Sequence, residues 1–343
     1  MQMDRVEEAL RTSGRLVIDP ALTSYVRGLV CRVSGPLCQD IRVYVVQTPY
    51  FNASMVPNGA MQVWTGLLLR AESEAQLAYV VAHEMGHYLK RHSVQQWRNL
   101  RNTAAVTTFF RALTGAAGLG FVGDLGALAA LGGVFAYSRE HEREADLVGG
   151  ELARRAGYDL REAPRIWEAL LREQEASGTK SRSIFFATHP PTEDRIASLR
   201  RLAEASGPAG GSGDVGVETF QAVTLPLRGV WLRDELRRRE FAGSQVLLDR
   251  LLANGVCAGE LYFFQGELYR LRSGEGDEVK ALAAYERALE LDGAPAETHR
   301  ALGLTLMKQG HRARAREAFA RYLEGRPNAE DRQMVESYVR QLE

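Results

Sequence analysis

The chain has 343 residues, 45% of them hydrophobic, so we expect two folded domains and exclude a largely disordered polypeptide. Its 43 Lys and Arg residues balance 43 Asp and Glu residues, which gives no general electrostatic footprint for nucleic acid. The three cysteines show no metal or redox spacing. Cys31 and Cys38 could pair in an oxidising compartment, but we expect buried or free thiols.

The N-terminal residues 1–8 lack the apolar core of a signal peptide, so the chain is either cytoplasmic or exported by a signal that this sequence lacks. Residues 103–138 are rich in Ala, Gly, Leu and Phe. Arg111 and Asp124 interrupt this stretch and leave uncharged runs shorter than the about 20 residues that a membrane span needs. We expect a buried or interfacial helical hairpin there, which could contact a membrane surface peripherally.

The first 204 residues predict an α+β domain that is mainly helical. Short β-branched runs between turn signals indicate a small antiparallel sheet, and apolar periodicity indicates the helices around it. The expected strands cover residues 41–46, 52–56 and 61–64. The expected helices cover two segments within 1–34, then 67–70, 72–92, 138–156, 160–175 and 192–204.

Composition changes at residues 205–217, where Gly and Ser predict a flexible linker between a domain over 1–204 and a domain over 218–343. The second domain is helical and repetitive. Ala281 and Tyr285 find counterparts in Ala315 and Phe319, about 34 residues later, which is the period of tetratricopeptide repeats (TPRs). We predict an all-α TPR solenoid with a concave surface for a peptide or partner protein. A plain helical bundle with accidental periodicity is the alternative.

The helix expected over 72–92 contains the motif His83-Glu84-Met85-Gly86-His87. Residues four apart lie on one face of a helix, so both imidazoles could bind a single ion. Glu84, one step round the helix, could then act as general base on a metal-bound water. The apolar residues that flank both histidines predict that this face is buried.

A zinc peptidase site needs a third protein ligand. A third histidine shortly after the motif is excluded because Lys90 and Ser93 occupy the diagnostic positions, and His92 is one residue early, on a different helix face. In the helix expected over 138–156, Glu142 and Asp146 are four apart, so Glu142 can ligate the ion and Asp146 can hydrogen-bond a ligating histidine. We expect the other acids of this helix to be solvated: Glu140, Glu144 and Glu151.

Three segments together resemble peptidase family M48. They are the His83–His87 motif, Tyr137-Ser138-Arg139 before Glu142 and Asp146, and Thr188-His189-Pro190-Pro191-Thr192 before Arg195. This family includes HtpX, the CAAX prenyl proteases and the periplasmic BepA-type proteases, and the attached repeats favour the BepA-like branch. The resemblance covers about residues 15 to 203 and implies a gluzincin-type metalloprotease domain.

The resemblance implies a zinc metalloendopeptidase with one Zn²⁺ per chain, held by His83, His87 and Glu142, and it selects Glu142 over Glu144. Glu84 would be the general base. The His and Arg of the third segment lie near the site in the family, which maps onto His189 and Arg195 as catalytic residues. His189 has two open roles: to stabilise the oxyanion, or to fill the fourth zinc position and keep the enzyme latent.

We expect the substrates to be unfolded or misassembled proteins in protein quality control. The strand expected over 61–64 is our candidate for the edge that binds substrate backbone by strand addition. The alternative function is a TPR scaffold or holdase chaperone with latent or secondary protease activity. A third possible function, a membrane-embedded prenyl-type protease, would require residues 103–138 to span the membrane. The resemblance implies the periplasm or cell envelope, with the cytoplasm as the alternative.

Overall fold

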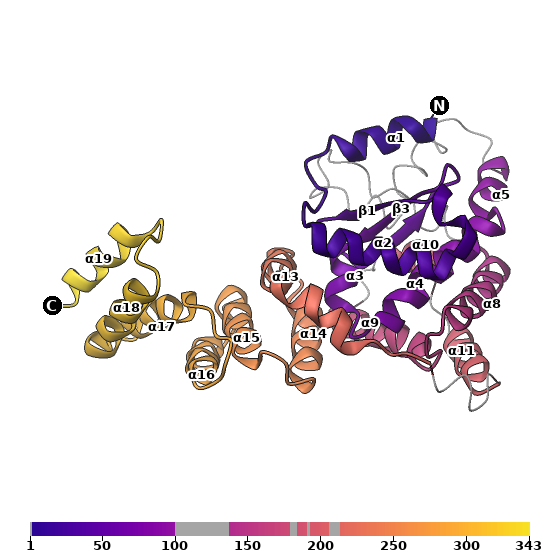
Figure 1. Cartoon of the computed structure of the whole chain (residues 1–343). Helices are drawn as coiled ribbons and strands as arrows, with labels where there is room; N and C mark the ends of the chain where they lie inside the picture. The colour runs from indigo at the N-terminus through magenta and orange to yellow at the C-terminus, as the bar shows by residue number, and fades with distance from the viewer. Residues whose placement is uncertain (1, 100–136, 179–183, 191–192, 206–212) are drawn as a thin grey trace. The chain divides into compact units, whose positions relative to one another are not determined.

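The computed structural model describes residues 2–99, 137–178, 184–190, 193–205 and 213–343 (Figure 1). The chain divides into two compact units, Met1–Glu235 and Leu236–Glu343. Most of the hairpin expected over 103–138 lies outside the described residues. Across the ranges that the structure describes, none of the helices is both long enough and apolar enough to cross a membrane.

The first unit contains a sheet of three strands, β1 (Arg42–Val46), β2 (Ala53–Met55) and β3 (Ala60–Trp64), in the order β1-β3-β2. β2 pairs antiparallel with β3, but β1 pairs with β3 in parallel. The prediction of an antiparallel sheet is therefore wrong for the pairing of β1 with β3. After the turn at Gly59, which has a φ of 88°, β3 returns between β1 and β2 instead of beside β2 alone.

The central position of β3 changes which strand could accept a substrate. Both sides of β3 already pair with neighbouring strands, and all five of its residues are buried. The expectation that residues 61–64 form a substrate-binding edge is therefore wrong. Among the described strands, β2 and β1 form the edges of the sheet.

α1 (Gln2–Arg11) precedes α2 (Pro20–Ser34), which packs against β1 and the long helix α4 (Glu74–Leu89) (Figure 1). After α2, Gly35 has a φ of 55° and turns the chain into the 3-10 helix η1 (Gly35–Asp40). This reversal brings the Cα atoms of Cys31 and Cys38 to 4.7 Å, and the two cysteines form a disulfide. Our expectation of two thiols is wrong, because it overlooked the turn that the glycine allows.

α3 (Thr65–Arg70) leads to α4, whose start is capped by Ser73, which accepts a hydrogen bond from the backbone N–H of Gln76. α5 (His92–Asn99) follows α4. α4 is buried along nearly its whole length and packs against α2, β2, α8 (Arg139–Arg155) and α9 (Glu162–Ser177). α10 (Ile184–Thr188) and α11 (Glu193–Ala205) complete this region.

Two glycines let α4 and α8 approach very closely. A Cβ atom added at Gly86 would lie 2.7 Å from the backbone oxygen of Ala145. A Cβ atom added at Gly149 would lie 2.8 Å from the backbone nitrogen of His83. Since real Cβ contacts are longer, each of these two backbone contacts requires a glycine on one of the helices.

The predicted linker over 205–217 lies partly outside the described residues, and its described end is held by backbone hydrogen bonds. The N–H of Asp214 donates to Gly157, and the N–H of Ala75 donates to Val215. α13 (Val217–Arg237) follows, and Glu235 near its end forms an ion pair with Arg70. The first unit therefore runs to Glu235, later than the predicted boundary, because these contacts tie α13 to it.

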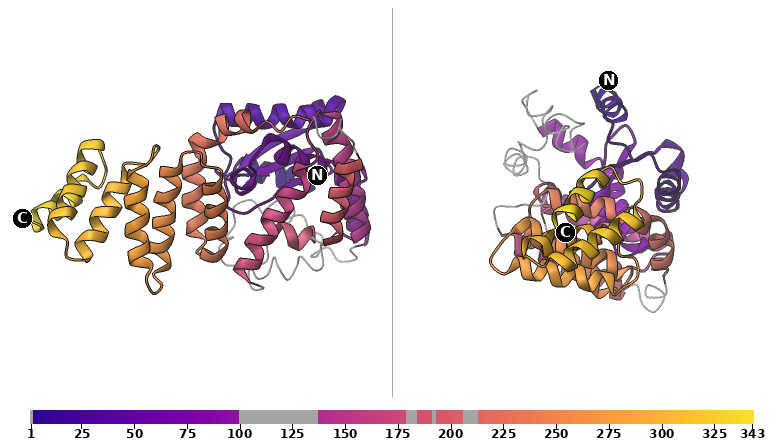
Figure 2. Two further views of the ribbon diagram at one scale, coloured as in Figure 1. Left: turned by 90° about the horizontal axis from the view of Figure 1, so that it is seen from below. Right: turned by 90° about the vertical axis from the view of Figure 1, so that its left-hand side faces the viewer.

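The second unit consists of α14 (Phe241–Ala253), α15 (Ala258–Arg272), α16 (Asp277–Leu289), α17 (Glu297–Lys308), α18 (Arg312–Gly325) and α19 (Arg332–Gln341). Successive helices pack side by side, as Figure 2 shows. A glycine–aromatic contact recurs within it. Added Cβ atoms at Gly266 and Gly303 would lie 2.4 Å and 2.7 Å from the rings of Tyr285 and Phe319, respectively.

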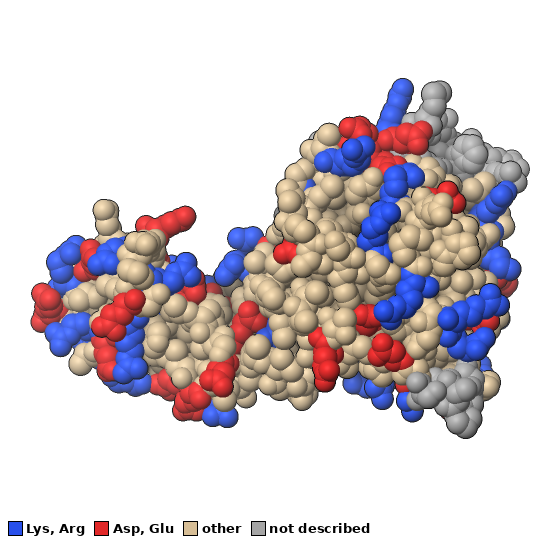
Figure 3. All heavy atoms as spheres, viewed as in Figure 1, with Lys and Arg blue, Asp and Glu red and all other residues tan. Residues whose placement is uncertain are grey.

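Charges of both signs are mixed over the molecular face in Figure 3, in line with the balanced composition. Ion pairs also join neighbouring helices of the second unit, such as Lys308 with Glu278. The expectation that this protein does not bind nucleic acid stays a prediction.

The close approach of α4 and α8 can be tested at Gly149. Gly149→Ala should lower the free energy of unfolding by about 1–3 kcal/mol, because the new methyl group meets backbone atoms that cannot move alone. The matched control is Gly150→Ala, where the nearest atoms belong to the flexible end of the Leu202 side chain. Urea denaturation measures both. Equal stability of the two variants would contradict the described packing.

Candidate metal centre

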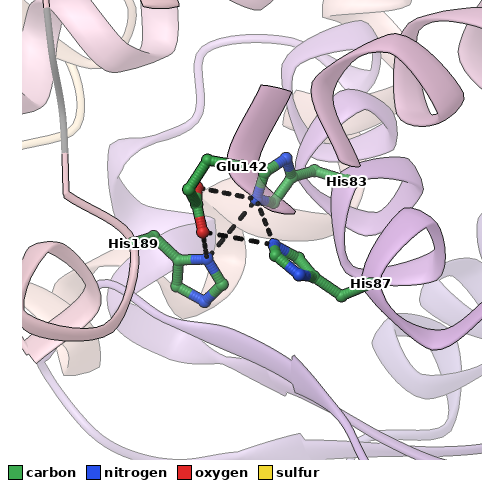
Figure 4. Close-up of side chains that lie close together, drawn as sticks. All are labelled: His83, His87, Glu142 and His189. Atoms are coloured by element: carbon green, nitrogen blue, oxygen red, sulfur yellow. Dashed lines mark hydrogen bonds and ion pairs between the residues drawn. The ribbon is translucent and has the colours of Figure 1, made fainter. Parts of the chain in front are cut away.

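Four buried side chains from three segments meet in the first unit (Figure 4). His83 and His87 come from α4, Glu142 comes from the first turn of α8, and His189 follows α10. One donor atom from each lies within 4.8 Å of the others, and none of the four residues is more than 1% exposed. The structure therefore brings together the three predicted metal ligands and one predicted catalytic residue.

The distances between these donor atoms suit a small ion. Nε2 of His87 lies 3.1 Å from Nε2 of His83 and 3.3 Å from Oε1 of Glu142. Nε2 of His83 lies 3.6 Å from Oε2 of Glu142. Ligands at about 2.0–2.1 Å from a tetrahedral zinc ion stand about 3.4 Å apart, so the spacing and the donor types both fit zinc.

The protonation states of the ligands also favour metal binding. Burial lowers the pKa of His87 well below its ordinary value, so its ring is neutral and can offer a lone pair. Burial opposes ionisation of Glu142, but the charges of His189 and Arg195 outweigh it and hold the pKa of Glu142 well below the usual range. The group therefore presents a carboxylate and a neutral imidazole, the forms that coordinate a cation.

Asp146 lies behind His83, on the side away from the other donors. Its Oδ1 is 2.9 Å from Nδ1 of His83 and accepts a hydrogen bond from the hydroxyl of Tyr79 at 2.9 Å. Burial opposes its ionisation, but Arg195 lowers the pKa of Asp146 below its usual range. This carboxylate is placed where it can fix the orientation of His83, and that role stays a prediction.

Arg195 lies next to the metal-binding group, as the resemblance implies, and contacts the carboxylates of Glu142 and Asp146. Its guanidinium donates two hydrogen bonds of 2.8 Å to Asp146, and Nη1 lies 2.5 Å from Oε2 of Glu142. Nη1 also donates to the backbone oxygen of Pro190. Arg195 therefore positions two carboxylates and the segment after His189. These contacts suit a positioning role, and the catalytic role of Arg195 stays a prediction.

Glu84 faces His189 from α4. Its side chain is 2% exposed, and Oε1 lies 3.5 Å from Nε2 of His189. Burial raises the pKa of Glu84 above its ordinary value. A carboxylate with a raised pKa is a better proton acceptor near neutral pH, which suits a general base.

The ring of His189 stands between the ligands and Glu84. Its Nδ1 lies 3.0 Å from Oε1 of Glu142 and 3.4 Å from Nε2 of His83. The ring stacks on Phe185 at 4.4 Å. Burial alone would lower the pKa of His189, but the negative charges of Glu142 and Glu84 outweigh it and raise the pKa.

Sequence reasoning missed two residues that contact His87. Tyr137 stacks on the His87 ring at 4.0 Å, and its hydroxyl lies 2.8 Å from the hydroxyl of Ser93. Nδ1 of His92 lies 2.9 Å from Nδ1 of His87. The prediction that His92 lies on another helix face is wrong, because α4 ends at Leu89 and Arg91 adopts a left-handed φ of 55°.

Comparison with known proteins identifies the first unit. Residues 19–203 match the family model described as Peptidase family M48. This match covers more than half of the chain and includes every residue of the site above, so the chain belongs to peptidase family M48. The resemblance drawn from the three motifs is confirmed.

Individual relatives add detail. The chain is 28% identical over 220 residues to the beta-barrel assembly-enhancing protease of Escherichia coli K12, which covers 61% of this chain and 44% of that protein. It is 32% identical over 189 residues to the mitochondrial metalloendopeptidase OMA1 of Schizosaccharomyces pombe, which covers 53% of this chain and 54% of that protein. It is 34% identical over 159 residues to the mitochondrial metalloendopeptidase OMA1 of Arabidopsis thaliana, which covers 46% of this chain and 30% of that protein. The chain thus spans about half, or less than half, of the length of the curated relatives it matches.

The assignment of Glu142 as a ligand can be tested by metal analysis. Glu142→Gln should lose most of the zinc that the parental protein retains after dialysis, because an amide oxygen is a much weaker zinc ligand than a carboxylate. Glu140→Gln, on the same helix but exposed, is the matched control and should keep its zinc. Full retention of zinc by Glu142→Gln would show that another residue completes the site.

Proposed function

We propose that this protein is a zinc metalloendopeptidase of the gluzincin type, with one zinc ion held by His83, His87 and Glu142. The observation that carries this proposal is the convergence of two imidazole nitrogens and one carboxylate in a buried site on neighbouring helices. Membership of peptidase family M48 supports the same chemistry. When bound, zinc would supply Lewis acidity, which makes water a better nucleophile near neutral pH and polarises a peptide carbonyl.

In this proposal Glu84 moves the proton. It accepts a proton from the water that attacks the carbonyl carbon, and returns that proton to the amine nitrogen when the C–N bond breaks. Its raised pKa brings its proton affinity closer to what both transfers need at neutral pH. Arg195 and Asp146 hold Glu142 and His83 in place, and so keep the ligands aligned throughout the reaction.

Of the two roles left open for His189, we propose latency. Its Nδ1 lies at hydrogen-bonding distance from Glu142 and 3.4 Å from the ligand nitrogen of His83, where a fourth ligand would stand. Stacking on Phe185 stabilises the ring there. With His189 in this position a substrate carbonyl has no access to the ion, so movement of the segment after α10 would be needed for activity.

We propose that the substrate lies beside His87, near the end of β2. A cavity of about 370 Å³ opens there, between the end of β2 and the junction of α4 and α5. It is lined by Met55, Pro57, His87, Tyr88, Leu89, Arg91, Ser93 and Val94. We propose that the substrates are unfolded or misassembled proteins in protein quality control.

We propose that the second unit is built from TPR-like repeats that bind substrate or a partner protein. The recurring contacts of Gly266 with Tyr285 and of Gly303 with Phe319 support this, because each places a small residue of one helix against an aromatic ring of the next. Photo-crosslinking of an unfolded substrate to the Glu84→Gln protein tests it. Crosslinks within residues 236–343 are expected, and their absence from the second unit would contradict the proposal.

We place the protein in the cell envelope. The Cys31–Cys38 disulfide supports this placement, since disulfides persist in oxidising compartments. The similarity to the beta-barrel assembly-enhancing protease of Escherichia coli supports it too.

The general base is tested with Glu84→Gln. We expect cleavage of an unfolded protein to fall by about 10²–10⁴-fold while zinc remains bound, because the amide cannot accept the proton. In the parental protein, activity should fall as the pH drops through the raised pKa of Glu84, above the ordinary value of 4.5, since protonation removes the base. Unchanged cleavage by Glu84→Gln would show that another group is the general base.

The latency role is tested with His189→Ala. Removing the ring should raise the rate of cleavage, because the fourth position of the ion becomes open to water and substrate. Thr188→Ala, next to it and half-buried, is the control for local disturbance of the segment. A loss of activity in His189→Ala with zinc retained would favour the oxyanion role instead.

The compartment is tested by thiol alkylation in freshly lysed cells. We expect Cys31 and Cys38 to be protected until a reductant is added, and Cys257, which is exposed, to react at once. Immediate reaction of all three cysteines would argue for a reducing compartment.

A further inference from the structure

The outer side of His87 carries a chain of contacts that the proposed reaction does not use. Nδ1 of His87 faces away from Glu142 and lies 2.9 Å from Nδ1 of His92, the first residue of α5. His92 is 0% exposed. Its Nε2 lies 3.0 Å from Oε2 of Glu144, and Nζ of Lys90 lies 2.6 Å from Oε1 of the same carboxylate.

These contacts allow one consistent placement of protons. A neutral imidazole has one nitrogen that donates and one that accepts, so the two facing Nδ1 atoms share a single proton. If Nε2 of His87 binds an ion, the proton of His87 is on Nδ1 and is donated to His92. The proton of His92 is then on Nε2 and is donated to Glu144, a carboxylate that can only accept. Lys90 donates to the other oxygen of Glu144.

The two ligating histidines therefore have different partners. His83 faces the carboxylate of Asp146 at 2.9 Å, whereas His87 faces an imidazole. Tyr137 stacks on the His87 ring and limits its tilt, but stacking does not select a tautomer. For His87 that selection depends on His92.

We propose that His92 is a positioning residue for the metal ligand His87. By accepting a hydrogen bond at Nδ1, it fixes the tautomer of His87 that leaves Nε2 for the ion, and Glu144 with Lys90 anchors His92. This inference rests on the proposed zinc site. Partners of this kind change metal affinity by about 10–100-fold.

The test is a competition titration of the purified full chain with Zn²⁺ and a chromogenic chelator. His92→Leu should raise the zinc Kd by about 10–100-fold, because it removes the acceptor and keeps the apolar bulk. His92→Asn places its Oδ1 near the former Nδ1 and should recover most of this loss. His141→Ala removes a ring that stacks on His92 at 4.2 Å, so it controls for packing and should bind zinc like the parental protein.

The outcomes separate the two proposals. Failure of the parental protein to bind zinc would overturn the metal site itself. Parental zinc binding with an unchanged Kd in His92→Leu would overturn only the role of His92, as would equal weakening in His92→Leu and His92→Asn.

A spectroscopic test needs no variant to fold. The chain has seven histidines, so ¹⁵N-histidine labelling gives few ring signals. In the zinc-loaded parental protein, long-range ¹H–¹⁵N spectra should show His87 protonated at Nδ1 and His92 protonated at Nε2. A His87 ring with its proton on Nε2 would contradict the proposal.

Discussion

The contact between the backbones of α4 and α8 is the constraint on which the site depends. Gly149 packs against the backbone of His83, and Gly86 packs against Ala145, so no side chain separates the helices where the ligands are. Glu142 comes from the turn of α8 just before this contact, and its carboxylate reaches the two histidines of α4. Because α4 and the face of α8 that carries Glu142 are buried, the donors are held by packing before any ion binds.

Burying so many charged groups is tolerated because each has a partner. An unpaired carboxylate in such a place would cost several kcal/mol or would be protonated. Arg195 pairs with both Glu142 and Asp146 and keeps them ionised, and Asp146 in turn faces His83. The same network leaves Glu84 with a raised pKa beside His189. One arrangement thus brings together the proposed metal ligands, the proposed base and the histidine proposed to close the site.

The sequence predicted those parts of the site that helical periodicity determines. The spacing of His83 from His87, and of Glu142 from Asp146, is enough to place each pair on one face. Features set by single left-handed residues were missed: Gly35 brings Cys31 to Cys38, and Arg91 turns His92 back towards His87. Strand order was also missed, because local sequence indicates strands but not which of them is central.

The central claim is that α4 and α8 together form a zinc site. Crystals of the zinc-loaded protein, measured on both sides of the zinc absorption edge, test it most directly. We expect one strong anomalous peak per chain, at about 2.0–2.1 Å from Nε2 of His83, Nε2 of His87 and a carboxylate oxygen of Glu142. A peak bound to other residues, or no peak at this position in crystals that contain stoichiometric zinc, would contradict the account.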